Sequence, residues 1–299
     1  MLFNRNKNGF VLRVWQVFFL LLTVSFLFIA CKMFWTPNSP EGYVMPRAKR
    51  VILDKKLNEI SGIFYLNKDS GLIAITDDKQ KIYHLTLNGK ERNFLEEDIG
   101  EGAADYEDIV MVDSTIYVLV SNGTIKEVRK ENGNLQVKKY SLPLEGKNDF
   151  ETLYYDPDAQ GLIMLCKKCA IDDGKKARTA FRFDLAAKQF DQKPFYAIST
   201  IDVKRILPDD GRIDFAPSGA SIHPIEKRLY ILSSAGNLLV ITDLKGEIQE
   251  SYRLKPTLYP QAEGIAFAPN GDMYISNEAK LGKPTLLTII YNPTGKKQK

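Results

Sequence analysis

Histidine, cysteine and tryptophan are scarce in this sequence, whose 299 residues include two His, three Cys and two Trp. Three cysteines are too few for a zinc site built from four thiolates. The two histidines, His84 and His223, fall in different sequence repeats, and neither clearly stands where a His-assisted catalytic water would need it. No Gly-x-Ser-x-Gly, His-Glu-x-x-His or P-loop motif occurs, so the sequence does not support a serine-hydrolase elbow, a zinc-protease helix or a phosphate cradle.

Acidic residues are missing from residues 1–40, which carry Arg5, Lys7, Arg13 and Lys32. The other 37 of the 41 Lys and Arg residues balance 37 Asp and Glu. Basic residues beyond position 40 are scattered among acidic ones and form no long stripe. This pattern lacks the electrostatic footprint of a nucleic-acid-binding protein, and we expect no nucleic-acid partner.

The N-terminus reads as an export signal. Basic residues up to Arg13 precede Val14–Cys31, a run of 18 residues with three polar interruptions. Two interpretations are open: an uncleaved membrane helix, for which 18 apolar residues just suffice, or a signal cut before Cys31, which would then be lipidated. Because the positive charges precede the run, both place the rest of the chain outside the cytoplasm. We predict a signal or membrane anchor over residues 1–35 and a linker over residues 36–42.

One short motif recurs along the rest of the chain, an acidic residue just before an apolar strand. It occurs at Glu59, Glu107, Glu151 and Glu263, and an altered copy around Ser218 keeps the small residues but lacks the Glu. The separations are 48 residues (59 to 107), 44 (107 to 151) and 45 (218 to 263), while the gap of 67 (151 to 218) must hold an insertion. Self-similarity at 40–50 residues in a strand-rich sequence is typical of a β-propeller.

The fold class is therefore predicted to be all-β, a β-propeller over residues 43–293 with five blades. A sixth blade is the alternative, because Asp202–Arg212 lies in the wide gap; we interpret this stretch as a long connection. In the third blade we place an insertion at Lys167–Arg178. The last repeat is one strand short and Tyr43–Leu53 is one strand too many, so pairing this segment onto the last blade would close the ring. Residues 294–299 form a basic tail.

The motifs also resemble a known family. Glu-Ile-Ser-Gly, Glu-Asp-Ile, Phe-Glu, Pro-Ser-Gly and Glu-Gly-Ile follow one another in the order of the SdiA-regulated (YjiK-like) β-propeller family of bacterial envelope proteins. The resemblance covers Leu57 to Pro293. It implies a phytase-like propeller, a link to calcium in some members, and a location in the bacterial cell envelope. No enzyme activity is firmly attached to the family.

Residues just before the innermost strands of a propeller converge on one mouth of the central channel. Glu59, Glu107, Glu151 and Glu263 hold that position, and four crowded carboxylates would raise one another's pKa unless a cation sits among them. Oxygen ligands in a loose ring suit Ca²⁺, and nearby groups that could contribute, directly or through water, are Asp105, Asp149 and Ser218. Two alternatives are open: the Glu side chains accept hydrogen bonds from adjacent blades and pin the ring, or they form a catalytic carboxylate cluster.

Cys166 and Cys169 form a Cys-x-x-Cys motif. Outside the cytoplasm the expected outcome is a local disulfide. Free thiols, or a redox or metal role, are the alternatives, although the thioredoxin-like βαβ context of a redox motif is missing.

We therefore expect a membrane-tethered, monomeric binding or scaffold module with Ca²⁺ at the channel mouth, rather than an enzyme. Its partner is a protein or small molecule that the sequence does not identify. The rival class is a calcium-dependent hydrolase of phosphate esters or lactones, by analogy of fold. A metal with an open coordination position below a pocket would favour the hydrolase.

Overall fold

The computed structural model describes residues 39–88, 91–93, 99–100, 105–207, 214–280 and 282–294. The predicted signal or anchor, Cys31 and almost all of the predicted tail lie outside the described residues. In the described part of the chain, no helix is both long and apolar enough to cross a membrane.

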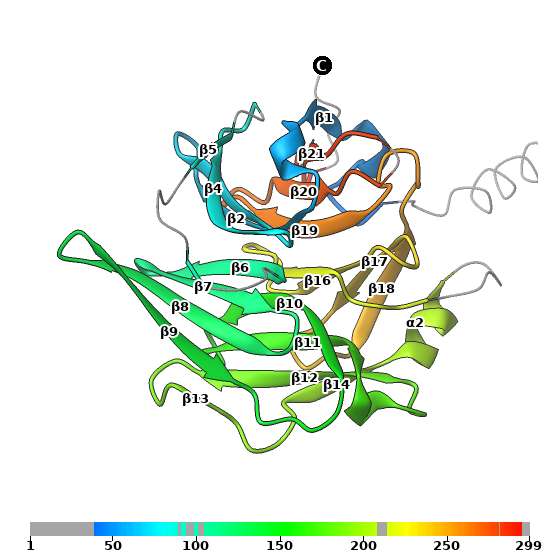
Figure 1. The fold of residues 1–299 in the computed structure, drawn as a ribbon. Coiled ribbons are helices and arrows are strands. Elements are labelled where there is room, and N and C mark those ends of the chain that lie inside the picture. Colours follow the sequence, from blue (N-terminus) through cyan, green and yellow to red (C-terminus); the bar gives the residue numbers. More distant parts are fainter. Residues whose placement is uncertain are drawn as a thin grey trace, which may run out of the picture. The chain divides into compact units, whose positions relative to one another are not determined.

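Five antiparallel sheets surround a central channel, so the predicted five-bladed propeller is confirmed (Figure 1). Each sheet is one blade, and its strands follow one another outward from the channel. The strands of the first three blades are β2 (Ile60–Asn67), β3 (Gly71–Thr76), β4 (Lys79–Leu85) and β5 (Glu91–Asn93); β6 (Tyr106–Val112), β7 (Thr115–Val120), β8 (Thr124–Glu131) and β9 (Asn134–Ser141); and β10 (Asn148–Asp156), β11 (Gly161–Cys169), β12 (Ala177–Asp184), β13 (Gln189–Phe190) and β14 (Tyr196–Ser199). Those of the last two are β15 (Gly219–Ile222), β16 (Leu229–Ser233), β17 (Leu238–Thr242) and β18 (Ile248–Arg253); and β19 (Ala262–Phe267), β20 (Met273–Asn277), β21 (Thr285–Ile289) and β1 (Lys49–Ile52).

The hydrophobic core is divided among the interfaces between blades. Five apolar clusters each combine side chains of two neighbouring blades, the last blade packing against the first. Strands inside a blade are therefore buried on both faces. This explains why β3, β16 and β17 are nearly continuous apolar runs with every residue buried.

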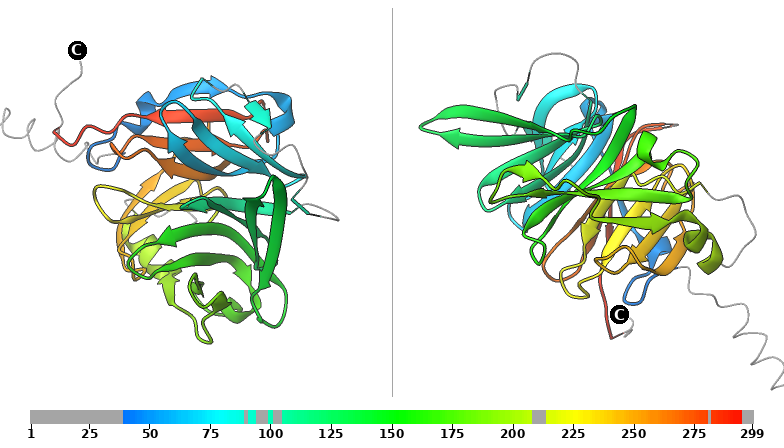
Figure 2. Two further views of the ribbon diagram at one scale, coloured as in Figure 1. Left: turned by 90° about the vertical axis from the view of Figure 1, so that its left-hand side faces the viewer. Right: turned by 90° about the horizontal axis from the view of Figure 1, so that it is seen from below.

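The ring closes as the sequence predicts. β1 pairs antiparallel with β21, from Lys49 opposite Thr288 to Ile52 opposite Thr285. Figures 1 and 2 show the first strand, in blue, beside the last strand, in red. Residues before β1 are fixed as well, because the Tyr43 hydroxyl donates to the carbonyl oxygen of Gly271 at 2.5 Å. Short 3₁₀ helices flank β1, namely η1 (Met45–Arg47) and η2 (Lys55–Leu57).

The wide gap between the third and fourth blades contains a helix that we did not predict. α2 (Thr200–Ile206) begins where a plain connection was expected. Its N-cap is Ser199, whose hydroxyl oxygen accepts from the backbone N–H of Asp202 at 3.2 Å. Val203 on this helix is buried in the cluster between the third and fourth blades, so packing rather than sequence period stabilises it.

The predicted insertion Lys167–Arg178 in the third blade is wrong at both ends, because β11 includes Lys167 and β12 begins at Ala177. β11 continues to Cys169, and the short helix η3 (Ala170–Asp172) and a turn then lead into β12. Both oxygens of the buried Asp172 carboxylate hold this turn, accepting from the Thr179 amide at 3.0 Å and its hydroxyl at 2.6 Å.

A belt of hydrogen bonds near the channel links neighbouring blades. It uses small polar side chains of the recurrent motifs and one buried aspartate. The bonds run from Ser61 Oγ to the Tyr106 carbonyl (2.6 Å), from the Leu153 amide to Asp108 Oδ2 (2.8 Å), from Ser218 Oγ to the Ala262 carbonyl (2.8 Å) and from Ser276 Oγ to the Ser61 carbonyl (3.1 Å).

Glycines allow the blades to approach along this belt. A Cβ on Gly62 would lie 2.5 Å from the Cα of Asp108 in the next blade. A Cβ on Gly219 would lie 2.2 Å from the carbonyl oxygen of Glu263. The small residues in the motifs are therefore explained by close backbone contact.

Candidate functional site

The innermost strands begin at one end of the channel, around a cavity of about 250 Å³. We call this cavity the acidic mouth. The residues that line it are Glu59, Ile60, Ser61, Asp77, Glu107, Glu151, Lys167, Ser218, Gln261, Glu263 and Glu278. The structure thus brings together all four motif glutamates and Ser218.

β-bulges place three of the glutamates. We predicted each Glu just before its strand, but Glu107, Glu151 and Glu263 lie within β6, β10 and β19. At each, the pairing register with the second strand shifts, so the Glu has no partner residue opposite it. A bulge inserts one extra residue and re-aims its side chain, which here faces the cavity. Only Glu59 precedes its strand, β2.

Burial opposes ionisation of these glutamates. The pKa of Glu107 rises to about 10, first because of burial and then because of the charges of Glu151, Asp105 and Asp149. Burial likewise raises the pKa of Glu263 to about 8, with Glu151 adding to it. Ionising a carboxyl group at the acidic mouth without a neutralising cation thus costs free energy.

Lys167 is the one basic side chain among the described residues lining the acidic mouth. Its Nζ pairs with Glu151 Oε1, whereas Glu151 Oε2 is buried without a hydrogen-bond partner. Burial raises the pKa of Glu151 to about 7, and Lys167 acts against this rise. One ammonium group therefore only partly neutralises the acids around it.

Besides Ile60 and Ser61, sequence reasoning missed four residues that line the acidic mouth. Asp77 and Glu278 directly follow the second strands β3 and β20, and Lys167 lies near the end of the second strand β11. Burial raises the pKa of Asp77 to about 6 and that of Glu278 to about 7, and Glu59 adds to both. Gln261, the fourth, hydrogen-bonds through its Nε2 to Glu278 Oε2. A search for charged residues near the ends of the second strands, made together with the Glu motifs, would have found Asp77, Lys167 and Glu278.

Asp105 and Asp149 stand outside the lining of the acidic mouth. Asp105 Oδ2 accepts a hydrogen bond from Ser121 Oγ. Both aspartates contribute only through their charge, which helps to raise the pKa of Glu107.

The acidic mouth has the donor chemistry of a calcium site, since its walls offer carboxylate oxygens and the buried Glu151 Oε2 lacks a partner. As the side chains stand, no three His, Cys, Asp or Glu residues in the described chain are grouped closely enough to hold a metal ion. Binding would require the glutamates to turn toward a common point. Hydrogen bonds between blades are made here by Ser61, Asp108, Ser218 and Ser276, and Glu59 also bonds Glu278 of the last blade.

Cys166 and Cys169 are joined by a disulfide at the end of β11, with their Cα atoms 5.7 Å apart. Both residues are buried. The bridge spans Lys167, and so closes the segment from which the ammonium group reaches the acidic mouth.

The histidines are remote from the acidic mouth. His84 lies in β4, as expected of a strand residue. His223 follows β15 and is fully buried, with its Nε2 2.7 Å from the Tyr43 hydroxyl oxygen. Its Nδ1 accepts from the amides of Ile225 (3.2 Å) and Glu226 (2.9 Å), which fixes the neutral ring with its proton on Nε2.

Comparison with known proteins agrees with the motifs. A family model described as SdiA-regulated matches residues 41–281. The chain belongs to the SdiA-regulated family. No curated protein matches the chain.

Solved structures agree with the propeller fold of this SdiA-regulated protein. It is similar to the soluble aldose sugar dehydrogenase from Escherichia coli in its apo form, with a TM-score of 0.52 and 11% identity, over 82% of this chain and 100% of that one. The PQQ-bound aldose sugar dehydrogenase from Streptomyces coelicolor gives a TM-score of 0.51 and 13% identity, over 82% and 98%. At such identities the likeness shows the fold alone.

Proposed function

We propose that this propeller is a membrane-tethered binding module of the cell envelope that takes up Ca²⁺ at its acidic mouth. Glu107, Glu151 and Glu263 would hold the ion, with Glu59 and Ser218 beside them. The observation that carries the proposal is the set of buried glutamates around one polar cavity whose pKa values are raised by burial and mutual charge. A bound divalent cation would favour the ionised form of all of them.

The bulges support the same proposal. A β-bulge interrupts the hydrogen-bond ladder between two strands, and it occurs where a side chain has to point in a new direction. Four blades shift register at this level. In three of them the extra residue is a Glu, whereas in the first blade the shift falls at Ser61 and Gly62. Serine side chains, without these three carboxyl groups, already link the first blade to the second and the fifth blade to both the fourth and the first.

The tether is proposed from the sequence. The basic N-terminus and the apolar run Val14–Cys31 would hold the chain at a membrane, either as an uncleaved helix or through a lipid on Cys31. The propeller would then work as a monomer outside the cytoplasm.

The test is calorimetric unfolding of the full chain in detergent, with excess chelator and then with millimolar Ca²⁺. Calcium is expected to raise the melting temperature, since a ligand at a hundredfold excess over its dissociation constant stabilises by about 2.7 kcal/mol. Glu107→Gln and Glu263→Gln should weaken that response. The matched control is Asp113→Asn, which removes an exposed charge from the turn after β6 and should leave the response intact.

An unchanged melting temperature in Ca²⁺ would contradict the proposal. So would a calcium response that survives both glutamate substitutions. Release of nitrophenol from nitrophenyl phosphate, dependent on Ca²⁺ and lost in Glu107→Gln, would instead favour the hydrolase alternative.

A further inference from the structure

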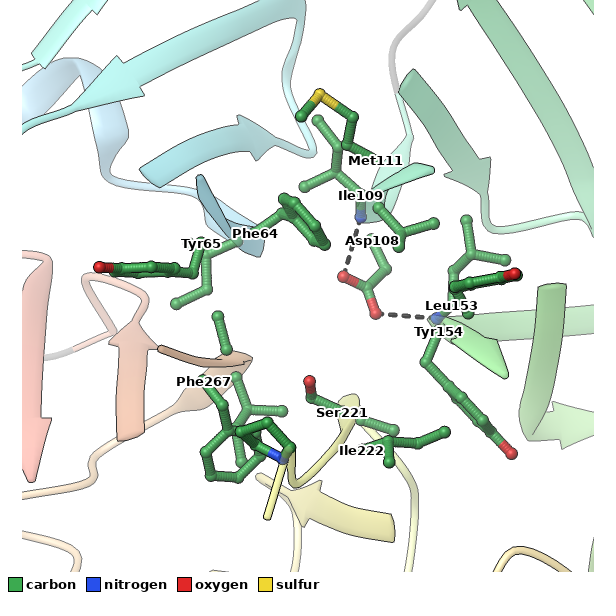
Figure 3. A pocket seen from close by; sticks show the side chains of 17 residues that line it. Phe64, Tyr65, Asp108, Ile109, Met111, Leu153, Tyr154, Ser221, Ile222 and Phe267 are labelled. Atoms are coloured by element: carbon green, nitrogen blue, oxygen red, sulfur yellow. Dashed lines mark hydrogen bonds between the residues drawn. The ribbon is translucent and has the colours of Figure 1, made fainter. Parts of the chain in front are cut away.

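The same channel has a second cavity, of about 220 Å³, lined by the continuation of the innermost strands β2, β6, β10, β15 and β19 (Figure 3). We call it the aromatic end. Its walls include Phe64, Tyr65, Met111, Tyr154, Ile222 and Phe267. None of these residues lines the acidic mouth.

Asp108 is the one carboxylate among the residues that line the aromatic end, and it is only 5% exposed. Its Oδ1 accepts from the Ile109 amide and its Oδ2 from the Leu153 amide, both at 2.8 Å (Figure 3). Each oxygen keeps a further lone pair. The hydroxyl of Ser221 is directed toward the same space in Figure 3.

No Lys, Arg or His occurs among the described residues that line this cavity. A buried carboxylate without a cationic partner is costly, and two amide hydrogen bonds repay only part of that cost. Burial raises the pKa of Asp108 well above its usual range, and the described lining offers its carboxyl group no basic partner. An ammonium group from outside would occupy that position.

We propose that the aromatic end binds a small organic monocation, an ammonium group carried on a single aromatic or branched aliphatic body. The ammonium would face Asp108 and Ser221, and the body would contact Phe64, Met111 and Ile222. This site goes beyond the calcium proposal and uses different residues.

The chemistry of the walls disfavours a metal ion here. Calcium takes six to eight oxygen ligands, whereas this cavity offers one carboxylate and a few hydroxyl and backbone groups among apolar side chains. The size also limits the ligand. Pockets for drug-sized molecules begin at about 300 Å³, so the aromatic end suits one ring with a short amine arm.

The test compares 2-phenylethylamine with 2-phenylethanol, a neutral molecule of similar shape, by titration calorimetry on the full chain in detergent. The amine should bind roughly tenfold more tightly than the alcohol, because only the amine pairs with the carboxylate. Asp108→Asn should abolish that preference. Ser221→Trp should block both probes by filling the cavity, while the control Ser114→Trp, in an exposed turn, should block neither.

Asp108 also joins two blades by accepting a hydrogen bond from the Leu153 amide, so Asp108→Asn is expected to lower stability as well. Ser221→Trp tests the site while leaving that hydrogen bond in place. Equal affinity for amine and alcohol, or no binding of the amine at millimolar concentration, would overturn the proposal. Amine binding that survives in Ser221→Trp would do so too. Displacement of the amine by Ca²⁺ would also contradict it, because the two cavities are lined by different residues.

Discussion

The two ends of the channel are lined by the same five innermost strands and yet have opposite chemistry. At the acidic mouth, bulges in three of the strands turn Glu107, Glu151 and Glu263 into the cavity. Beyond these bulges, residues such as Ile63 and Leu153 pack between blades. The three carboxyl side chains thus face the channel where the pairing of their strands is interrupted, and apolar side chains further along the same strands pack between blades.

The ends also differ in what they contribute to stability. At the acidic mouth, folding buries carboxyl groups whose pKa values rise, which destabilises the fold at neutral pH. At the other end, Tyr43 links the N-terminal segment to His223 and to Gly271 in neighbouring blades. We propose that the first arrangement serves calcium binding, whereas the second closes the ring.

The largest effect is expected from removing residues 41–53, which hold Tyr43 and the closing strand β1. Without them β21 would present an unpaired edge, and the last blade would lose apolar cover. We expect aggregation or loss of cooperative unfolding, measured by gel filtration and calorimetry. A truncated chain that stays monomeric and melts like the parent would disprove the closure.

The next effect tests the belt between the two ends. Gly62→Ala would place a Cβ 2.5 Å from the Cα of Asp108, and backbone must move to relieve it. We expect a loss of about 3 kcal/mol in the free energy of unfolding, measured with urea. Gly282→Ala is the control, because a Cβ there meets nothing within 4 Å. Equal stability of the two variants would show that the blades do not depend on this approach.

His223 gives the end that carries Tyr43 its own pH dependence. Burial lowers the pKa of His223 below 6.5, the charges of Lys227 and Arg228 lower it further, and Glu226 opposes them. Below pH 6.5, His223 binds a proton in the unfolded chain but stays neutral in the folded protein. The free energy of unfolding therefore falls as the pH falls, by at most about 1.4 kcal/mol per pH unit. His223→Gln should flatten the stability profile between pH 5 and 7. A profile unchanged by the substitution would rule out this contribution.

The contribution of the acidic mouth to stability should depend on pH in the opposite direction. The folded state holds the proton of Glu107 up to a pKa of about 10, while the unfolded chain loses it near 4.5, so stability falls as pH rises between these values. Glu107→Gln should therefore stabilise the calcium-free protein at pH 8, by on the order of 1 kcal/mol. Glu131→Gln, at an exposed strand end, should not. Destabilisation by Glu107→Gln would instead favour a structural pin.

The repeats were enough to predict the blades, the closing strand and the convergence of four glutamates. Apolar runs and motif spacing report these features directly, because each blade repeats the same burial. The bulges left no trace in the hydrophobic pattern, since one extra residue shifts it by a single position. Lys167 and Glu278 were missed because they reach the mouth from second strands, and α2 because Val203 is held by tertiary packing.

We expect the acidic mouth, and not the aromatic end, to take up a divalent cation. Anomalous diffraction from crystals grown with Ca²⁺ tests it most directly. We expect one anomalous peak coordinated by Glu107, Glu151 and Glu263, and no peak beside Asp108. A calcium-saturated crystal without a peak at these glutamates, or with its peak at Asp108, would contradict it.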